Sequence, residues 1–286
     1  ISECLVGSEM CIRDSMNTRL MKGQKVLQGY LSAKNPVDTW VSGTFAIAFW
    51  TVNHLWHLGK YNLGLSSCLG GTGMCISADI VREFGWGCDC LTEDMEFSMK
   101  CLSHGIRTCW VHDAIIYDEK PLTFMASWRQ RKRWAQGQFD CSERYIPILM
   151  KEGFKRHSIV VLDGIMQLLQ NYFLLISAFY LVMTYINMFY PCFTVVLYND
   201  ALVPRQFWSV LGTIQYVLPL IVLLQIEVPA KIYLYWLIYP VFMYSWVPVT
   251  FLGWIHRHEK QWVHTIHTRS MQFQAASLTR KKEIDS

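Results

Sequence analysis

Three short segments of the sequence carry side chains that could bind a phosphorylated sugar and move a proton. Residues 70–73 are GGTG, residues 92–94 are TED, and residues 130–134 are QRKRW. A carboxylate can act as a general base, and a guanidinium can hold phosphate oxygens with two hydrogen bonds. An aromatic ring offers a flat surface on which a sugar ring can stack. The sequence therefore suggests a site that binds a sugar diphosphate and activates a nucleophile.

The last of these segments has the most specific spacing. On a helix Gln130, Arg133 and Trp134 lie three to four residues apart and share an arc of about 100°. The neighbouring Arg129 and Lys132 project elsewhere. One face thus offers an amide, a guanidinium and an indole together, which suits a sugar diphosphate and a pyranose ring. The alternative is a basic interfacial helix that binds anionic lipid.

The other two segments are weak signals when each is taken alone. Glycines at 70, 71 and 73 are common wherever the backbone turns tightly or approaches a ligand. Thr92 is predicted to be an N-cap, with Glu93 and Asp94 in the first helical turn, where the helix dipole favours acids. Capping is more often the role of such residues than catalysis. A carboxylate at this position is expected to stay ionised, at some cost in basicity.

Strand and helix patterns surround these segments and must position them. The TED segment begins a predicted helix that ends near Gly105. The other predicted elements are strands at 25–32, 106–111 and 114–118, a loop and strand at 64–78, and helices at 37–58 and 122–139. The aromatic-rich helix at 37–58 could lie in a core or on a membrane surface, and we favour the core.

The second half of the chain is apolar enough to enter a lipid bilayer. The whole sequence is 52% hydrophobic and 17% charged, and charged residues are scarce mainly after residue 158. Residues 159–198 carry one charge, Asp163, whereas 206–226 and 232–255 carry none. A run of about 20 apolar residues can cross a bilayer, which predicts about three transmembrane helices over 159–255. The long first run could instead hold one crossing and an interfacial stretch.

Charge predicts the sidedness of this region. Residues 127–157 hold eight Arg and Lys against three acids, which marks the cytosolic side of a membrane protein. The tail at 256–286 is also basic, so we expect it in the cytosol, although three crossings would place it outside. The net charge of +4 gives no argument for nucleic acid. The ten cysteines lack paired metal-ligand spacings, and we expect no metal site among them.

The order of the three segments, followed by apolar spans, resembles the family 2 glycosyltransferases, the group that includes cellulose, chitin and hyaluronan synthases. The resemblance covers residues 20–158 and extends to residues 262–268, which resemble the W-x-x-T-x-H segment that follows the family's membrane helices. It implies an α/β fold, with residues 16–158 as the C-terminal half of a Rossmann-like GT-A domain that includes an interfacial helix. A transmembrane bundle and a cytosolic tail would follow.

The resemblance also implies a role for each candidate residue. Asp94 would be the base that deprotonates the acceptor hydroxyl, with inversion at the anomeric carbon, and Glu93 would support it. Arg133 and Gln130 would lie beside the leaving diphosphate, and Trp134 would form the platform for the acceptor sugar. The residues that would line the donor or acceptor pocket are Gly71, Thr72 and Gly73.

The family implies an enzyme of the cytoplasmic membrane, with its catalytic part in the cytosol, that makes polysaccharide. Its donor would be a nucleotide sugar such as a UDP-sugar, its acceptor a glycan or lipid-linked sugar, and a homo-oligomer is compatible with it. The family's DxD motif, which holds Mg²⁺ or Mn²⁺ on the donor, does not occur in this sequence. We therefore expect that the nucleotide-binding half is missing and that the chain is inactive by itself.

Residues 1–15 resemble a translated sequencing adapter, and we expect the genuine chain to resume near Met16 or Asn17. Two other classes of protein remain open. A non-catalytic membrane partner of a polysaccharide assembly or export machine would explain the apolar runs but not the ordered motifs. A transporter would place ionisable residues within its spans, where only Asp163 qualifies, at an edge.

Overall fold

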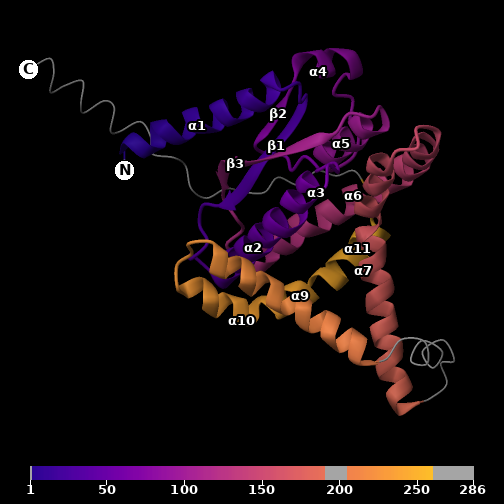
Figure 1. Cartoon of the computed structure of the whole chain (residues 1–286). Coiled ribbons are helices and arrows are strands. Elements are labelled where there is room, and N and C mark those ends of the chain that lie inside the picture. Colours follow the sequence, from indigo (N-terminus) through magenta and orange to yellow (C-terminus); the bar gives the residue numbers. More distant parts are fainter. Residues whose placement is uncertain (1, 191–204, 260–286) are drawn as a thin grey trace, which may run out of the picture.

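The computed structural model describes residues 2–190 and 205–259, which form a mixed α/β structure dominated by helices (Figure 1). The strands are β1 (Val26–Ala33), β2 (Met74–Ile76) and β3 (Thr108–Asp118). The helices are α1 (Ser2–Met21), α2 (Trp40–Thr51), the π-helix η1 (Val52–His57), α3 (Leu58–Asn62), α4 (Ala78–Phe84), α5 (Glu93–Ser103), α6 (Phe124–Lys155), α7 (Ile159–Phe189), α9 (Arg205–Gln225), α10 (Lys231–Tyr244) and α11 (Trp246–Ile255).

The sheet has three strands in the order β2-β1-β3, with β3 parallel and β2 antiparallel to the central β1. The prediction of two separate strands between residues 106 and 118 was wrong, because β3 is continuous. Gly29 pairs with Val111 and Tyr30 pairs with Ile115, so the three residues between Val111 and Ile115 bulge out of the ladder. Pairing with β1 on both sides of the bulge keeps the strand intact.

The central strand β1 is buried along its whole length. Because side chains alternate between the faces of a strand, its residues contact two different layers. Leu27 packs with Met16 of α1, and a Cβ atom at Gly29 would also meet that methionine. Val26 packs with Phe97 of α5 on the opposite face. The sheet therefore lies between α1 on one side and the helices of the candidate site on the other.

Helix α1 runs without interruption across the boundary between residues 15 and 16. Met16 is buried under the sheet, and Ile12 packs against the same cluster. The foreign origin of residues 1–15 stays a prediction.

The aromatic-rich helix α2 is a core helix, as predicted. Its N-terminus is closed by a capping box between Thr39 and Ser42, and most of its residues are buried. It lies between the sheet and the apolar helices α9 and α10 (Figure 1). A Cβ atom at Gly43 would lie 2.1 Å from the ring of Tyr235, so glycine is needed where α2 and α10 approach.

Two helical segments of the described chain are long and apolar enough to cross a membrane, rather than the predicted three. They are Ile159–Asn187 and Lys231–Ile255, the second of which comprises α10 and α11. Helix α9 contains a shorter apolar stretch, Gly212–Gln225, because polar residues such as Gln206 and Ser209 occupy its first turns. The predicted tail at 256–286, including the segment at 262–268, lies almost entirely outside the described residues.

The two ends of α7 have different surroundings. Near its start, Asp163 lies 2.7 Å from the buried ammonium of Lys60 in α3, and that lysine also donates to Gln167. Toward its end, Phe179 and Phe189 are exposed. Asp163, the one charged residue of this apolar run, therefore pairs with the α/β part on which α7 packs. A transporter is expected to carry ionisable residues within its spans, and Asp163 does not fill that role.

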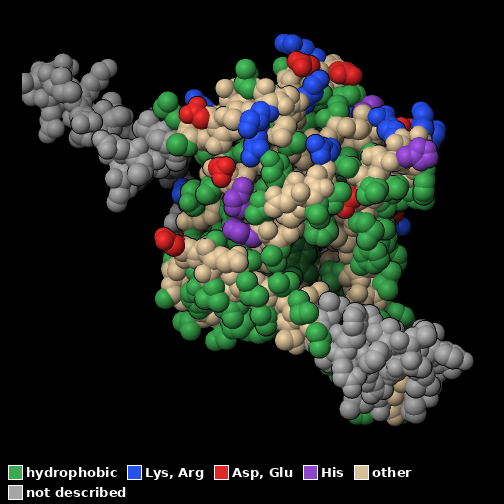
Figure 2. All heavy atoms as spheres, in the orientation of Figure 1, with side chains coloured by type: hydrophobic (Ala, Val, Ile, Leu, Met, Phe, Trp, Pro, Cys, Tyr) green, Lys and Arg blue, Asp and Glu red, His purple; other side chains and the backbone are tan. Residues whose placement is uncertain are grey.

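Hydrophobic side chains dominate the surface over α9 and α10, whereas Lys and Arg gather toward the sheet side of the molecule (Figure 2). The large exposed apolar residues of α9 and α10 include Val210, Leu224, Leu234, Leu237 and Val241. A soluble protein rarely exposes a contiguous apolar surface of this kind.

Candidate active site

The TED segment and the segment at 130–134, called QxxRW after Gln130, Arg133 and Trp134, meet where α5 begins. A Cβ atom at Gly137 of α6 would lie 2.5 Å from Oγ1 of Thr92 and 2.7 Å from its backbone nitrogen. Gly137 follows Arg133 by one helical turn and Gln130 by two, so it occupies the same face of α6 as both residues. The face predicted to carry chemistry is therefore the face on which the first turn of α5 rests.

Thr92 precedes the first residue of α5, as predicted, but its side chain does not cap the helix. Its Oγ1 atom is buried and makes no hydrogen bond to any described residue. The close contact with Gly137 takes up the space around this hydroxyl. The prediction of a side-chain N-cap was therefore wrong, and the expected position of the helix start was right.

Asp94 is half-buried in the first turn of α5, while its neighbour Glu93 is exposed. Its Oδ1 atom accepts a hydrogen bond of 2.8 Å from the backbone nitrogen of Met95. Its Oδ2 atom faces the glycine-rich loop, because a Cβ atom at Gly71 would lie 3.3 Å from it. The TED and GGTG segments are thus brought together at this carboxylate.

Burial raises the pKa of Asp94 from 3.8 to about 6. The backbone N–H of Met95 and the positive charge of Arg133 lower this pKa, and the charge of Glu93 raises it, but burial outweighs them. We expected the helix dipole to make this carboxylate less basic, and the opposite holds. At pH 7 Asp94 is mostly ionised and is a stronger base than an exposed aspartate.

The glycine-rich loop is fixed by a residue that the motifs did not indicate, Gln28 of β1. Its Oε1 atom accepts from the backbone nitrogen of Gly70 at 2.8 Å, and its Nε2 atom donates to the carbonyl of Thr72 at 2.9 Å. Gly71 and Gly73 adopt positive φ angles of 79° and 65°, which favour glycine. One signal could have indicated this residue: Gln28 is a polar side chain within a strand that is buried on both faces.

The three predicted residues of QxxRW have different surroundings. Arg133 is half-buried and close enough for its charge to act on Asp94. The Oε1 atom of Gln130 is buried and makes no hydrogen bond to any described residue. Trp134 lies on the other edge of the face and contacts Phe45 edge-on and Trp246 in a stacked geometry at 6.4 Å.

Arg131, one of the eight basic residues between 127 and 157, is fully buried. Its guanidinium lies over the rings of Phe242 and Trp246, and its Nη1 atom donates to Ser245 at 2.8 Å. These partners flank the junction of α10 and α11, about 115 residues away. The membrane-type helices therefore contact the QxxRW segment directly.

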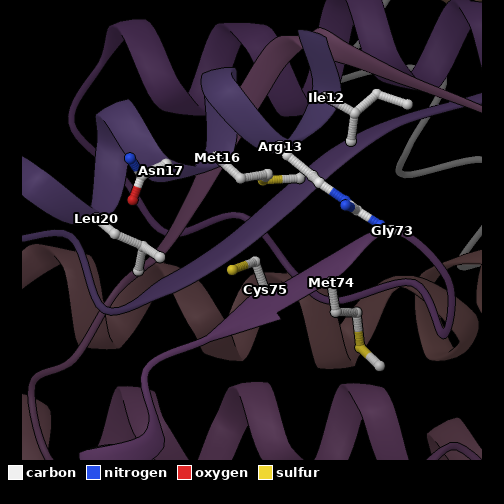
Figure 3. Close-up of a pocket in the computed structure, with 8 residues that line it drawn as sticks. All are labelled: Ile12, Arg13, Met16, Asn17, Leu20, Gly73, Met74 and Cys75. Carbon is white, nitrogen blue, oxygen red and sulfur yellow. The ribbon is translucent and has the colours of Figure 1, made fainter. Parts of the chain in front are cut away.

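One cavity of the described chain touches the glycine-rich loop but is not lined by Asp94 or by the QxxRW residues. It has a volume of about 290 Å³ and is bounded by α1 and by the start of β2, with Met16, Leu20 and Met74 among its lining residues (Figure 3). Of the predicted site residues only Gly73 lines it. Its walls are mostly apolar, with Arg13 and Asn17 of α1 as polar exceptions, and none of the candidate catalytic side chains lines it.

Within residues 2–190 and 205–259, no three His, Cys, Asp or Glu side chains are grouped so that they could hold a metal ion. The sequence also contains no DxD motif. The described residues therefore do not fit a catalytic Mg²⁺ or Mn²⁺.

The chain matches one known protein over a short stretch and a family model over most of its length. An 80-residue stretch is 30% identical to the probable glycosyltransferase YdaM of Bacillus subtilis strain 168, and it covers 28% of this chain and 19% of that protein. Residues 7–254 match the family model described as glycosyl transferase family group 2. Because this match runs from α1 into α11 and contains the carboxylate, the glycine-rich loop and the QxxRW face, the chain belongs to this family of glycosyltransferases.

Proposed function

We propose that this chain forms the acceptor-side part of a membrane-bound, inverting glycosyltransferase. The enzyme transfers a sugar from a nucleotide sugar, a UDP-sugar in our proposal, to a hydroxyl of a glycan or lipid-linked acceptor in polysaccharide biosynthesis. The observation that carries the proposal is the environment of Asp94, which is a half-buried carboxylate with a pKa near 6, below the glycine-rich loop and within the electrostatic reach of Arg133.

Asp94 acts as the general base in this reaction. It takes the proton of the acceptor hydroxyl while that oxygen attacks the anomeric carbon of the donor. The new carbon–oxygen bond forms on the face opposite the leaving group. The bond to phosphate breaks, and its electron pair stays on the nucleoside diphosphate, so the configuration at the anomeric carbon inverts.

In our proposal, the face of α6 that is directed toward Asp94 holds the leaving diphosphate and the acceptor sugar. Arg133 offsets the charge that develops on the leaving diphosphate. The amide of Gln130 can donate to a phosphate oxygen through Nε2, and its buried Oε1 atom can accept a hydrogen bond from a sugar hydroxyl. Trp134 offers the edge of its ring to the acceptor sugar, while the rest of the indole is held by Phe45 and Trp246.

A membrane location is supported by the apolar helices. The exposed end of α7 and the outer surfaces of α9 and α10 present large hydrophobic side chains that lipid would cover. The basic residues at 127–157 lie before the first apolar helix, which favours a cytosolic position for the α/β part. We propose a multi-pass protein of the cytoplasmic membrane.

We propose that the metal and the nucleotide are bound by residues that are not part of this chain. The described residues do not fit Mg²⁺ or Mn²⁺, so no step is assigned to a metal here. The DxD ligands and the nucleotide-binding residues belong, in this proposal, to sequence that lies upstream in the gene. The chain of 286 residues should then bind donor poorly and not turn over.

The test compares membranes that contain this chain with membranes that contain the chain joined in frame to the upstream coding sequence of its gene. Both receive a panel of UDP-sugars with Mg²⁺ or Mn²⁺, and products are identified by mass spectrometry. We expect transfer only in the joined protein. Metal-dependent transfer by the 286-residue chain would overturn the division of the site.

The role of Asp94 is tested in the joined protein by Asp94→Asn. General-base catalysis contributes roughly 10²- to 10⁴-fold, so the variant should lose transfer by that factor. Asp79→Asn is the matched control, since this aspartate is exposed in α4 and is not one of the proposed site residues. If Asp94→Asn inserts in the membrane normally and keeps its transferase activity, a non-catalytic role in a polysaccharide machine becomes the better explanation.

A further inference from the structure

We propose that Gln28 is a positioning residue that holds the Gly70–Gly73 loop over the carboxylate of Asp94. Its importance for sugar transfer rests on the proposed function, but the positioning itself rests only on the geometry of the described residues. No motif in the sequence points to this glutamine, which lies about 65 residues before Asp94.

The amide of Gln28 joins the strand to both ends of the loop. Only 1% of its surface is exposed. It accepts from the Gly70 nitrogen at 2.8 Å and donates from Nε2 to the Thr72 carbonyl and to the Gly29 carbonyl, both at 2.9 Å. The Gly29 nitrogen adds a bond of 3.0 Å to the Gly73 carbonyl. The loop is thus pinned before and after Gly71.

A second set of bonds connects the same loop to the turn that carries the carboxylate. The hydroxyl of Ser98 in α5 accepts from the Leu69 nitrogen at 2.9 Å and donates to the Asp94 carbonyl at 2.8 Å. Gln28 and Ser98 therefore anchor the loop to β1 and to α5, respectively. Gly71 lies between these anchors, and the Cα hydrogen that occupies its Cβ position is directed at Oδ2 of Asp94.

This arrangement decides how much water reaches the carboxylate. Gly71 occupies a position that water would otherwise take, because an added Cβ atom there would be only 3.3 Å from Oδ2. Removing the amide of Gln28 leaves the Gly70 N–H and the Thr72 carbonyl without their partner on β1, and the loop, which is exposed to solvent, is then free to move away from Asp94. The carboxylate then becomes hydrated, and its pKa falls.

Other titratable groups also act on Asp94 and must be held constant. They are Glu93 on the same helix, Arg133 on α6 and Cys68 in the segment before the loop. None of them contacts Gln28 through a described hydrogen bond. A change at Gln28 should therefore reach Asp94 through the loop.

The experiment measures the titration of Asp94 in the 286-residue chain in detergent, without any activity assay. The thermal unfolding midpoint is recorded from pH 4 to 8 for the chain with Asp94 and for Asp94→Asn, and the pH dependence of their difference reports the pKa of Asp94. The pair is then measured again in a Gln28→Met background. The pKa should move from about 6 toward 3.8.

Gln136→Met is the matched control. This buried glutamine of α6 donates to the His256 carbonyl at 2.9 Å, so the variant loses a buried hydrogen bond and its midpoint falls. The titration of Asp94 should stay near 6, because Gln136 does not contact the loop. If Gln28→Met acted only through a general loss of stability, Gln136→Met would change the titration of Asp94 in the same way.

If Gln28→Met does not fold, Gln28→Asn replaces it, since the shorter amide cannot reach both ends of the loop. Hydrogen exchange in the unmodified chain adds an independent measure, and the Gly70 amide should be as protected as those of β1. An unchanged titration in the folded Gln28 variant, or fast exchange at Gly70, would overturn the proposal. If Asp94 proves not to be the catalytic base, the measured effect of Gln28 on its pKa still stands. The positioning role of Gln28 and the catalytic role of Asp94 can therefore fail independently.

Discussion

Replacing Asp94 by asparagine should make the folded chain more stable at neutral pH. The pKa of Asp94 is about 6 in the folded protein, against 3.8 for an unperturbed aspartate. The folded state therefore binds a proton more tightly than the unfolded state does. This protonation stabilises the fold below pH 4, and the stabilisation is lost as the pH rises toward 6. Asparagine resembles the protonated side chain and does not incur this loss.

The size of the effect follows from the pKa difference. Each pKa unit corresponds to about 1.4 kcal/mol, so the gap between 3.8 and about 6 corresponds to about 3 kcal/mol at pH 7. This value is an upper limit because Asp94 keeps some contact with solvent. At roughly 2–4 °C per kcal/mol, the unfolding midpoint of Asp94→Asn should rise by up to about 6–12 °C.

Tryptophan fluorescence can follow this unfolding in detergent micelles, since the chain has 12 tryptophans. The gain in midpoint should be largest at pH 7 and nearly absent at pH 4. Asp79→Asn removes the same charge from an exposed site and serves as the control for the loss of one negative charge. A gain that does not change with pH, or a loss of stability at pH 7, would refute the argument that burial controls this carboxylate.

Two further predictions concern the contacts between the α/β part and the apolar helices. Lys60→Met leaves the Asp163 carboxylate without its partner and should cost about 3–5 kcal/mol, and adding Asp163→Asn should recover much of it in the same unfolding assay. Gly43→Ala places a methyl group 2.1 Å from the ring of Tyr235 and should cost about 1–3 kcal/mol. Gly59→Ala, where nothing lies within 4 Å, should be neutral or stabilising, and equal effects at the two glycines would contradict the packing of α2 on α10.

Local patterns in the sequence were sufficient to locate most of the elements around the site. The strand at 25–32 corresponds to β1, and the helix predicted to start at TED begins at Glu93 and ends before Gly105, whose φ is 83°. Met99 and Leu102, which lie three residues apart on this helix, are both buried. These features depend on neighbours within a few residues, where helical and strand periodicity acts.

The sequence was less informative where distant partners decide the outcome. Three apolar runs predicted three crossings, but hydropathy does not show which part of a run packs on protein, and Asp163 in α7 is held by Lys60. Likewise nothing in the local pattern of α6 indicates that Arg131, one of the eight basic residues at 127–157, is buried. The rings of Phe242 and Trp246, more than 110 residues away, bury it.

The sequence by itself determined the family and the identity of the candidate side chains, because the order of the GGTG, TED and QxxRW segments is a property of the chain alone. Only the tertiary structure decided their state. The helix dipole, a local effect, predicted a less basic Asp94, whereas burial under a loop held by Gln28 raises its pKa. Burial depends on groups that are far apart in the sequence, and so it appears only when the chain has folded.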